Sequence, residues 1–163
     1  MNAYRHTQFG KVIVISIGTG IAVIIASAAI SLAVLPASAW VLEIATIALL
    51  GCIVVFLAIV LALFANLTVE IDAEHLRIRF GIGLIRKRFP LDQIDTCRPV
   101  SNPWIYGLGI RLTPHGWLYN VSGVEAVELK MKSGKTCRIG TDEPEVLTTA
   151  LQEALDSLKP APE

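Results

Sequence analysis

The sequence predicts an α+β membrane protein, with two transmembrane helices followed by a small β-rich domain. Glu43 is the only charged residue within residues 12–69. The hydrophobic content of 53% and the mean hydropathy of +0.60 exceed what the core of a soluble domain of 163 residues needs. From Leu67 onward, apolar and polar residues alternate, which is typical of strands. We therefore expect the apolar excess to lie in a membrane and the remainder in water.

Two apolar runs, residues 12–35 and residues 44–66, are the predicted transmembrane helices. Each is as long as the ~20 residues that a helix needs to cross a hydrocarbon core of ~30 Å. The connection, residues 36–43, is too short for a domain, so the two helices are expected to form a hairpin with a short extracytoplasmic turn. Residues 1–11 are expected to be a cytoplasmic N-terminal segment, and residues 159–163 a tail.

A secretory signal peptide is the alternative interpretation of the first apolar run. Arg5 and Lys11 precede the run, and Ala37-Ser38-Ala39 resembles a cleavage site. The run is about twice as long as the usual apolar region of a signal peptide, which favours a retained helix. The orientation of the second helix is the same in both cases, because it carries the chain from outside to inside.

Basic residues near the helix ends predict the orientation. Arg5 and Lys11 precede the first helix, several arginines follow the second, and the connection holds only Glu43. Segments rich in Lys and Arg stay in the cytoplasm. Both termini and the β-rich domain, residues 67–158, are therefore expected to be cytoplasmic.

Small residues recur every three or four positions in both apolar runs, so each run carries a face on which another helix could approach closely. This face either packs the hairpin on itself or remains available to another membrane protein. The residues expected to serve in this transmembrane packing are Gly18, Ala22, Ala26, Ala29, Ala33, Gly51, Ala58 and Ala62.

The cytoplasmic part is predicted to hold about seven short antiparallel strands. Residues 67–72, 76–80 and 84–89 are separated by turn-sized gaps, and further short strands are expected up to Ile139. Asp142 and Glu145 then have the spacing of a helix N-cap and a capping box. The apolar residues after them recur at helical spacing, which predicts one amphipathic helix covering the open end of a barrel or sandwich.

Three stretches of this part, LTVEIDAEHLRIRFG, GLGIRLTPHGWLYNVSG and LKMKSGKTCRIGTDEPEVL, resemble the bacterial pleckstrin-homology-like family of membrane-anchored proteins. The resemblance covers roughly residues 67–158. It implies a seven-stranded fold of two orthogonal antiparallel sheets closed by a C-terminal helix, in a bacterial cytoplasmic membrane. It implies no activity. Eukaryotic relatives of this fold bind phosphoinositides through a basic first loop. The resemblance does not imply this binding here, because the corresponding loop, Ala73-Glu74-His75, lacks the cations for it.

No motif in the sequence predicts catalysis, a cofactor or a metal site. The paired glycines are not followed by the third glycine of a nucleotide-binding loop, as in Gly81 and Gly83. His6, His75 and His115 stand far apart in the sequence without metal-ligand spacing. We therefore expect a protein that is not an enzyme and has no cofactor.

Two candidate contact surfaces remain. A basic hairpin close to the membrane could meet anionic lipid headgroups, or could be an ordinary solvated sheet face; its residues are Arg77, Arg79, Arg86, Lys87 and Arg88. Trp104 and Tyr106 follow Pro103 in a predicted loop, where an aromatic ring can anchor a partner. The acidic C-terminal helix argues against nucleic acid as a partner.

The expected function is therefore that of a non-enzymatic, membrane-tethered interaction module, a scaffold or accessory subunit of a membrane protein complex. Its partners would be the lipid bilayer and either another membrane protein or a second copy of the chain. The alternative is a peripheral domain that senses anionic lipid headgroups.

Overall fold

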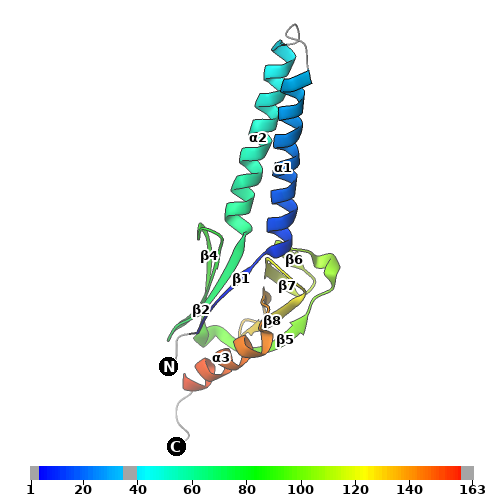
Figure 1. The fold of residues 1–163 in the computed structure, drawn as a ribbon. Helices are drawn as coiled ribbons and strands as arrows, with labels where there is room; N and C mark the ends of the chain where they lie inside the picture. The colour runs from blue at the N-terminus through cyan, green and yellow to red at the C-terminus, as the bar shows by residue number, and fades with distance from the viewer. Residues whose placement is uncertain (1–3, 35–39, 159–163) are drawn as a thin grey trace, which may run out of the picture.

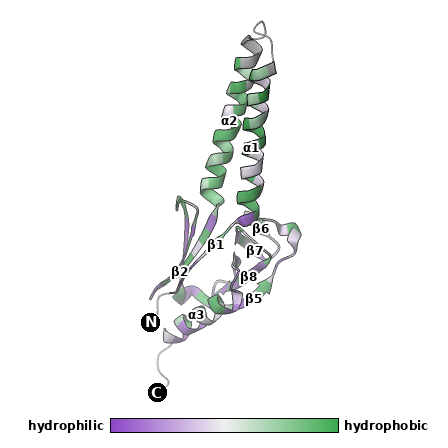
Figure 2. Cartoon of the chain, in the orientation of Figure 1, coloured by the Kyte–Doolittle hydropathy of each residue, from purple (hydrophilic) through white to green (hydrophobic). Residues whose placement is uncertain are grey.

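The computed structural model describes residues 4–34 and 40–158. Two long helices, α1 (Lys11–Val34) and α2 (Trp40–Phe64), run side by side and project from one end of a β-rich domain (Figure 1). Most of each helix is apolar, as the green in Figure 2 shows, and their most apolar windows bury no residue inside the chain. Each is long and apolar enough to cross a membrane.

The first sheet has four antiparallel strands in the order β1-β2-β3-β4. Their bounds are β1 Tyr4–Phe9, β2 Asn66–Ile71, β3 His75–Phe80 and β4 Ile85–Pro90. Strand β1 precedes α1 and pairs along its whole length with β2, which follows α2. The two helix ends that join the domain are therefore held together by a sheet.

Strand β1 corrects the expectation that residues 1–11 are only a segment outside the domain. Its sequence, YRHTQF, has large apolar or aromatic side chains only at its two ends, so no alternating pattern marks it as a strand. Pairing with β2 gives it a place in the sheet. The tertiary context thus decides its conformation.

The second sheet has five strands in the order β5-β8-β9-β7-β6. Their bounds are β5 Ile94–Ser101, β6 Gly109–Thr113, β7 Gly116–Asn120, β8 Glu125–Met131 and β9 Thr136–Gly140. The β8–β9 hairpin lies between β5 and the β6–β7 hairpin, so β9 runs parallel to β7. The described residues thus contain nine strands and one parallel pair, where about seven antiparallel strands were expected.

Both sheets and the C-terminal helix α3 (Pro144–Ser157) bury one common core. Fully buried side chains come from the first sheet, such as Phe80, from the second, such as Leu129, and from α3, such as Leu151. The helix lies at the end of the domain opposite α1 and α2 (Figure 1). The amphipathic pattern therefore predicted correctly that a helix covers the sheets.

The start of α3 differs from the expected N-cap. Glu143 is the residue before the helix and makes no capping hydrogen bond with its side chain. Asp142 Oδ1 instead accepts a hydrogen bond from His6 Nε2 at 2.7 Å. This contact ties the N-terminal strand β1 to the beginning of the C-terminal helix.

Candidate functional site

Alternation along the first sheet gathers arginines on its outer face. Arg77 of β3 lies opposite Arg88 of β4, and Arg79 lies opposite Arg86. Directly opposed residues point to the same side of a sheet. Arg5 of β1 joins the same face, because it lies opposite Glu70, which in turn lies opposite Arg77. We call these five arginines the basic face.

Lys87 does not belong to the basic face. It lies opposite Ile78, whose side chain is fully buried on the core side of the sheet. Successive residues of a strand point to opposite sides. Four of the five predicted headgroup-contacting residues therefore share one surface, and Lys87 projects from the other side of the edge strand.

Acidic residues neutralise part of the basic face. Glu70 contacts both Arg79 (2.8 Å) and Arg5 (3.2 Å), and Asp72 contacts Arg77 at 2.8 Å. A backbone hydrogen bond from Glu74 is the main cause that lowers the pKa of Asp72, so its charge is retained at neutral pH.

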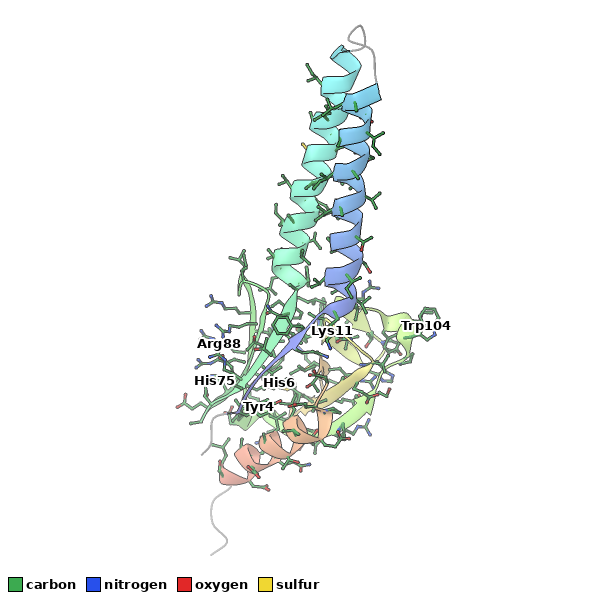
Figure 3. The ribbon with its side chains drawn as sticks, in the orientation of Figure 1. Tyr4, His6, Lys11, His75, Arg88 and Trp104 are labelled. Atoms are coloured by element: carbon green, nitrogen blue, oxygen red, sulfur yellow. The ribbon has the colours of Figure 1, made fainter. Side chains whose placement is uncertain are left out.

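On the first sheet, the basic residues that form no ion pair lie on β4. Within the described residues, Arg86, Lys87 and Arg88 form no ion pair, and all three are exposed. Arg86 donates from Nε to the carbonyl of Gly83 in the preceding turn. Figure 3 shows Arg88 directed away from the domain, on the side opposite Trp104. The basic residues and Trp104 therefore form two separate surfaces.

Trp104 lies in a short 3-10 turn, η3 (Trp104–Tyr106), between β5 and β6. Its side chain is 83% exposed, and that of Ile105 is 71% exposed. Tyr106 is half-buried, with its ring centroid 6.3 Å from that of His115. The two predicted partner-contacting aromatics are thus close in the chain, but only Trp104 is fully presented to the outside.

Hydrogen bonds hold the Trp104 turn in place. The buried Asn102 donates its backbone N–H to the carbonyl of Val124 (2.7 Å), and its side-chain oxygen accepts from Arg138 Nη1 (2.8 Å). Gly107, with φ at +63°, closes the turn by donating to the carbonyl of Trp104. An apolar ring on a fixed backbone loses less conformational entropy on binding than one on a mobile loop.

A buried charge network anchors this turn to the second sheet. Glu128 of β8 lies opposite both Arg138 of β9 and Arg98 of β5. One carboxylate oxygen accepts from Arg138 Nε (2.8 Å), and the other accepts from Arg98 Nη2 (2.6 Å). The Arg138 side chain is 7% exposed, whereas that of Arg98 is 70% exposed.

Burial and hydrogen bonding oppose each other at Glu128. Desolvation raises the pKa of its carboxyl, but the hydrogen bonds from Arg138 and Arg98 outweigh it and leave the pKa lowered. Because Glu125 and Glu128 alternate with apolar neighbours on a predicted strand, the sequence predicts that both face solvent. Glu125 is exposed, but Glu128 is buried. The signal that could have found the pair is the charge inside two apolar strand segments, AVELKM and TCRIG.

The other aromatics near Trp104 divide between surface and core. Tyr119 is buried and packs its ring against Phe80 and Phe89. Trp117 is about half exposed and lies opposite Leu112, which is also exposed. Strands β6 and β7 therefore present a second apolar pair to the outside.

The helix pair makes its internal contact mostly with large residues. The half-buried positions of α1 include Ile17, Ile24 and Ala28, and those of α2 include Leu50 and Val54. Among the predicted packing residues, Gly18 and Ala62 are half-buried. The others lie on exposed parts of the helices: Ala22, Ala26, Ala29, Ala33, Gly51 and Ala58.

The structure thus does not bring the small residues together within one hairpin. Ala29 and Gly51 instead line an open apolar groove of about 510 Å³ between the two helices. The expectation that these eight residues pack the hairpin on itself stays a prediction. Their use against another helix stays a prediction.

The titratable groups of the described residues form no arrangement typical of catalysis. No group of three His, Cys, Asp or Glu residues in this part of the chain is placed to hold a metal ion. Burial raises the pKa of the Cys97 thiol, and raises that of Cys137 to about 12. Neither thiol is therefore an activated nucleophile.

No family model, no curated protein and no solved structure matches this chain. Its candidate functional features are the basic face, the Trp104 turn and two long apolar helices.

Proposed function

We propose that this chain is a non-enzymatic, membrane-tethered interaction module, a scaffold or accessory subunit of a membrane protein complex. The observation that carries the proposal is the Trp104 turn, which presents Trp104 and Ile105 outward on a backbone fixed by buried hydrogen bonds. Exposed aromatic rings on rigid supports are typical anchors of protein interfaces. The partner is another membrane protein or a second copy of this chain.

In this proposal α1 and α2 cross the membrane as a hairpin. The pairing of β1 with β2 supports it, because one sheet holds the strand before α1 and the strand after α2. Cleavage of a signal peptide at the sequence Ala37-Ser38-Ala39, which lies outside the described residues, would remove β1 from that sheet. The retained helix is therefore favoured over the signal peptide.

The orientation that we propose places the domain and both termini in the cytoplasm of a bacterium. Lys11 lies at the domain end of α1, and the basic face belongs to the sheet that joins both helices. The connection at the far end contains only Glu43 as a charged residue. This asymmetry follows the rule that basic segments remain inside.

We further propose that the domain is pleckstrin-homology-like, as the sequence resemblance implies. Two packed sheets with a C-terminal helix over their common core support this assignment. Strand β1 and the parallel pairing of β7 with β9 depart from a purely antiparallel seven-stranded arrangement. In this view β1 is an addition that couples the domain to its membrane helices.

The alternative function, sensing of anionic lipid headgroups, is favoured by the unpaired charges on β4. Each basic side chain close to an anionic membrane contributes about 1 kcal/mol. However, β4 runs away from the helices at ~3.3 Å per residue, so only its first residues are close to the membrane (Figure 1). Ion pairs already engage Arg77 and Arg79. These facts rank lipid sensing second.

Purification of the full chain in a mild detergent distinguishes the two functions. The interaction module is expected to retain one partner, or a second copy, at a fixed stoichiometry. A bare monomer that binds vesicles only when they contain anionic lipid would contradict the proposal and support the alternative.

A further inference from the structure

The turn between β3 and β4, residues 81–84, lies against the last turn of α2. Ile82 donates its backbone N–H to the carbonyl of Ala62 at 3.0 Å. Gly81 has φ at +47°, and a Cβ added there would lie 1.9 Å from the same carbonyl oxygen. Only glycine permits this close approach. The position of the turn beside α2 is therefore fixed by the backbone.

Two large apolar side chains project from this turn. Ile82 is 68% exposed and Leu84 is 74% exposed. Phe9, also exposed, ends β1 directly before α1 and lies opposite Asn66, the first residue of β2. Phe9 and the turn therefore lie at the same end of the first sheet's strands, the end from which both helices leave.

The length of α2 places this end of the sheet at the boundary of the membrane's hydrocarbon core. The apolar part of α2 has 21 residues. At ~1.5 Å per residue it spans ~32 Å, close to the ~30 Å of a hydrocarbon core. Ala62 belongs to the last turn of this span, so the turn that contacts it lies at the same depth.

From this geometry we infer that residues 81–84 form a membrane-inserted tip, in which Ile82 and Leu84 enter the edge of the bilayer beside α2. The inference rests on the proposed function, because it requires α1 and α2 to span the membrane. Lipid covers this apolar surface. The turn is hydrogen-bonded to α2, so the lipid that surrounds α2 also contacts the turn. Arg86 lies two residues farther along β4, ~7 Å from Leu84, at the level of the headgroups.

The insertion also gives the domain a fixed orientation relative to the membrane. The two helices and the inserted tip provide three attachment points, all at the same end of the first sheet's strands. The basic face then stands at an angle to the membrane, with Arg86 close to it and Arg88 farther away. The tip, and not the basic face as a whole, is the membrane-contacting part of the hairpin.

An environment-sensitive fluorophore on a cysteine at position 84 tests this inference. The variant is Leu84→Cys in a Cys52→Ala background, with the full chain reconstituted into phosphatidylcholine vesicles. The thiols of Cys97 and Cys137 are buried and have raised pKa values, so they react slowly with the label. Val146→Cys is the matched control, since Val146 is an exposed apolar residue on the distal helix α3.

The label at position 84 is expected to emit at shorter wavelength than the label at 146. Brominated acyl chains should quench it several-fold more strongly, and a label at Ile82→Cys should behave in the same way. Equal quenching at 84 and 146 in a chain that resists alkaline extraction would overturn the inference and leave the proposed function intact. A short-wavelength emission without quenching by brominated lipid would also overturn it, since protein would then cover the tip. Extraction of the chain at alkaline pH would overturn both.

Discussion

Replacement of Arg138 by methionine is expected to lower the free energy of unfolding of the domain by about 3–5 kcal/mol. The guanidinium of Arg138 is buried, donates one hydrogen bond to Glu128 and one to Asn102, and forms an ion pair with the same Glu128 oxygen. Its removal leaves the buried carboxylate of Glu128 with only Arg98 as a partner and removes one hydrogen bond from Asn102. A buried carboxylate that loses its buried partner is far less favourable than one that keeps both partners. Urea unfolding of the full chain in detergent, followed by circular dichroism, measures the change.

Arg98→Met is the matched control, because Arg98 contacts the same carboxylate from an exposed position. It is expected to change the unfolding free energy by at most about 1 kcal/mol. The lowered pKa of Glu128 provides a second readout. Its contribution to stability is present above the ordinary pKa of a glutamate and is lost as the pH falls through the lowered value. Equal effects of the two substitutions would contradict the assignment of Arg138 as the buried partner.

Replacement of Trp104 by alanine is expected to weaken association with the protein partner by more than ~1 kcal/mol, about fivefold or more in affinity. The domain should stay folded, because the side chain is 83% exposed and its backbone is held by Asn102 and Gly107. The fraction of chain that retains the partner during purification in mild detergent, together with the melting temperature, measures both effects.

Val146→Ala is the control for this experiment, since it also removes an exposed apolar side chain but lies on α3. It should leave partner retention unchanged. Unfolding of the Trp104→Ala variant would show that the ring serves the fold and not an interface. Loss of the partner on neutralising Arg86, Lys87 and Arg88 together, but not on removing Trp104, would place the interface on the basic hairpin.

The sequence predicted those parts of the fold that have a strong local pattern. The long apolar runs predicted two long helices, and the α+β arrangement with a final helix is confirmed. Alternation in β3, where Leu76, Ile78 and Phe80 are buried, also indicated which side of the strand faces the core. Local patterns suffice where burial alone decides the conformation.

Features that depend on distant parts of the chain could not be predicted in this way. Strand β1 exists because β2, some sixty positions later, offers it an edge. The parallel pairing of β7 with β9 depends on the order of strands in the sheet, which no local pattern determines. The buried position of Glu128 depends on two arginines from other strands.

The candidate surfaces also divide into features that the local sequence predicted and features that depend on distant residues. Trp104 is exposed, as its position after Pro103 in a loop indicated. The five basic residues of the predicted hairpin do not act as one set, because acidic residues of β2 and the β2–β3 turn engage Arg77 and Arg79, and Lys87 points to the other side. The proposed tip at Ile82 and Leu84 depends on the contact between its turn and α2, which no local pattern indicates.

Cysteine accessibility at two positions tests the membrane-tethered arrangement most directly. A cysteine replacing Ser38, in the connection between the helices, is expected to react in intact cells with a maleimide that cannot cross membranes. A cysteine replacing Ser133, in the exposed β8–β9 turn, should react only after the membrane is opened. Reaction at Ser133→Cys but not at Ser38→Cys in intact cells would contradict the cytoplasmic location of the domain.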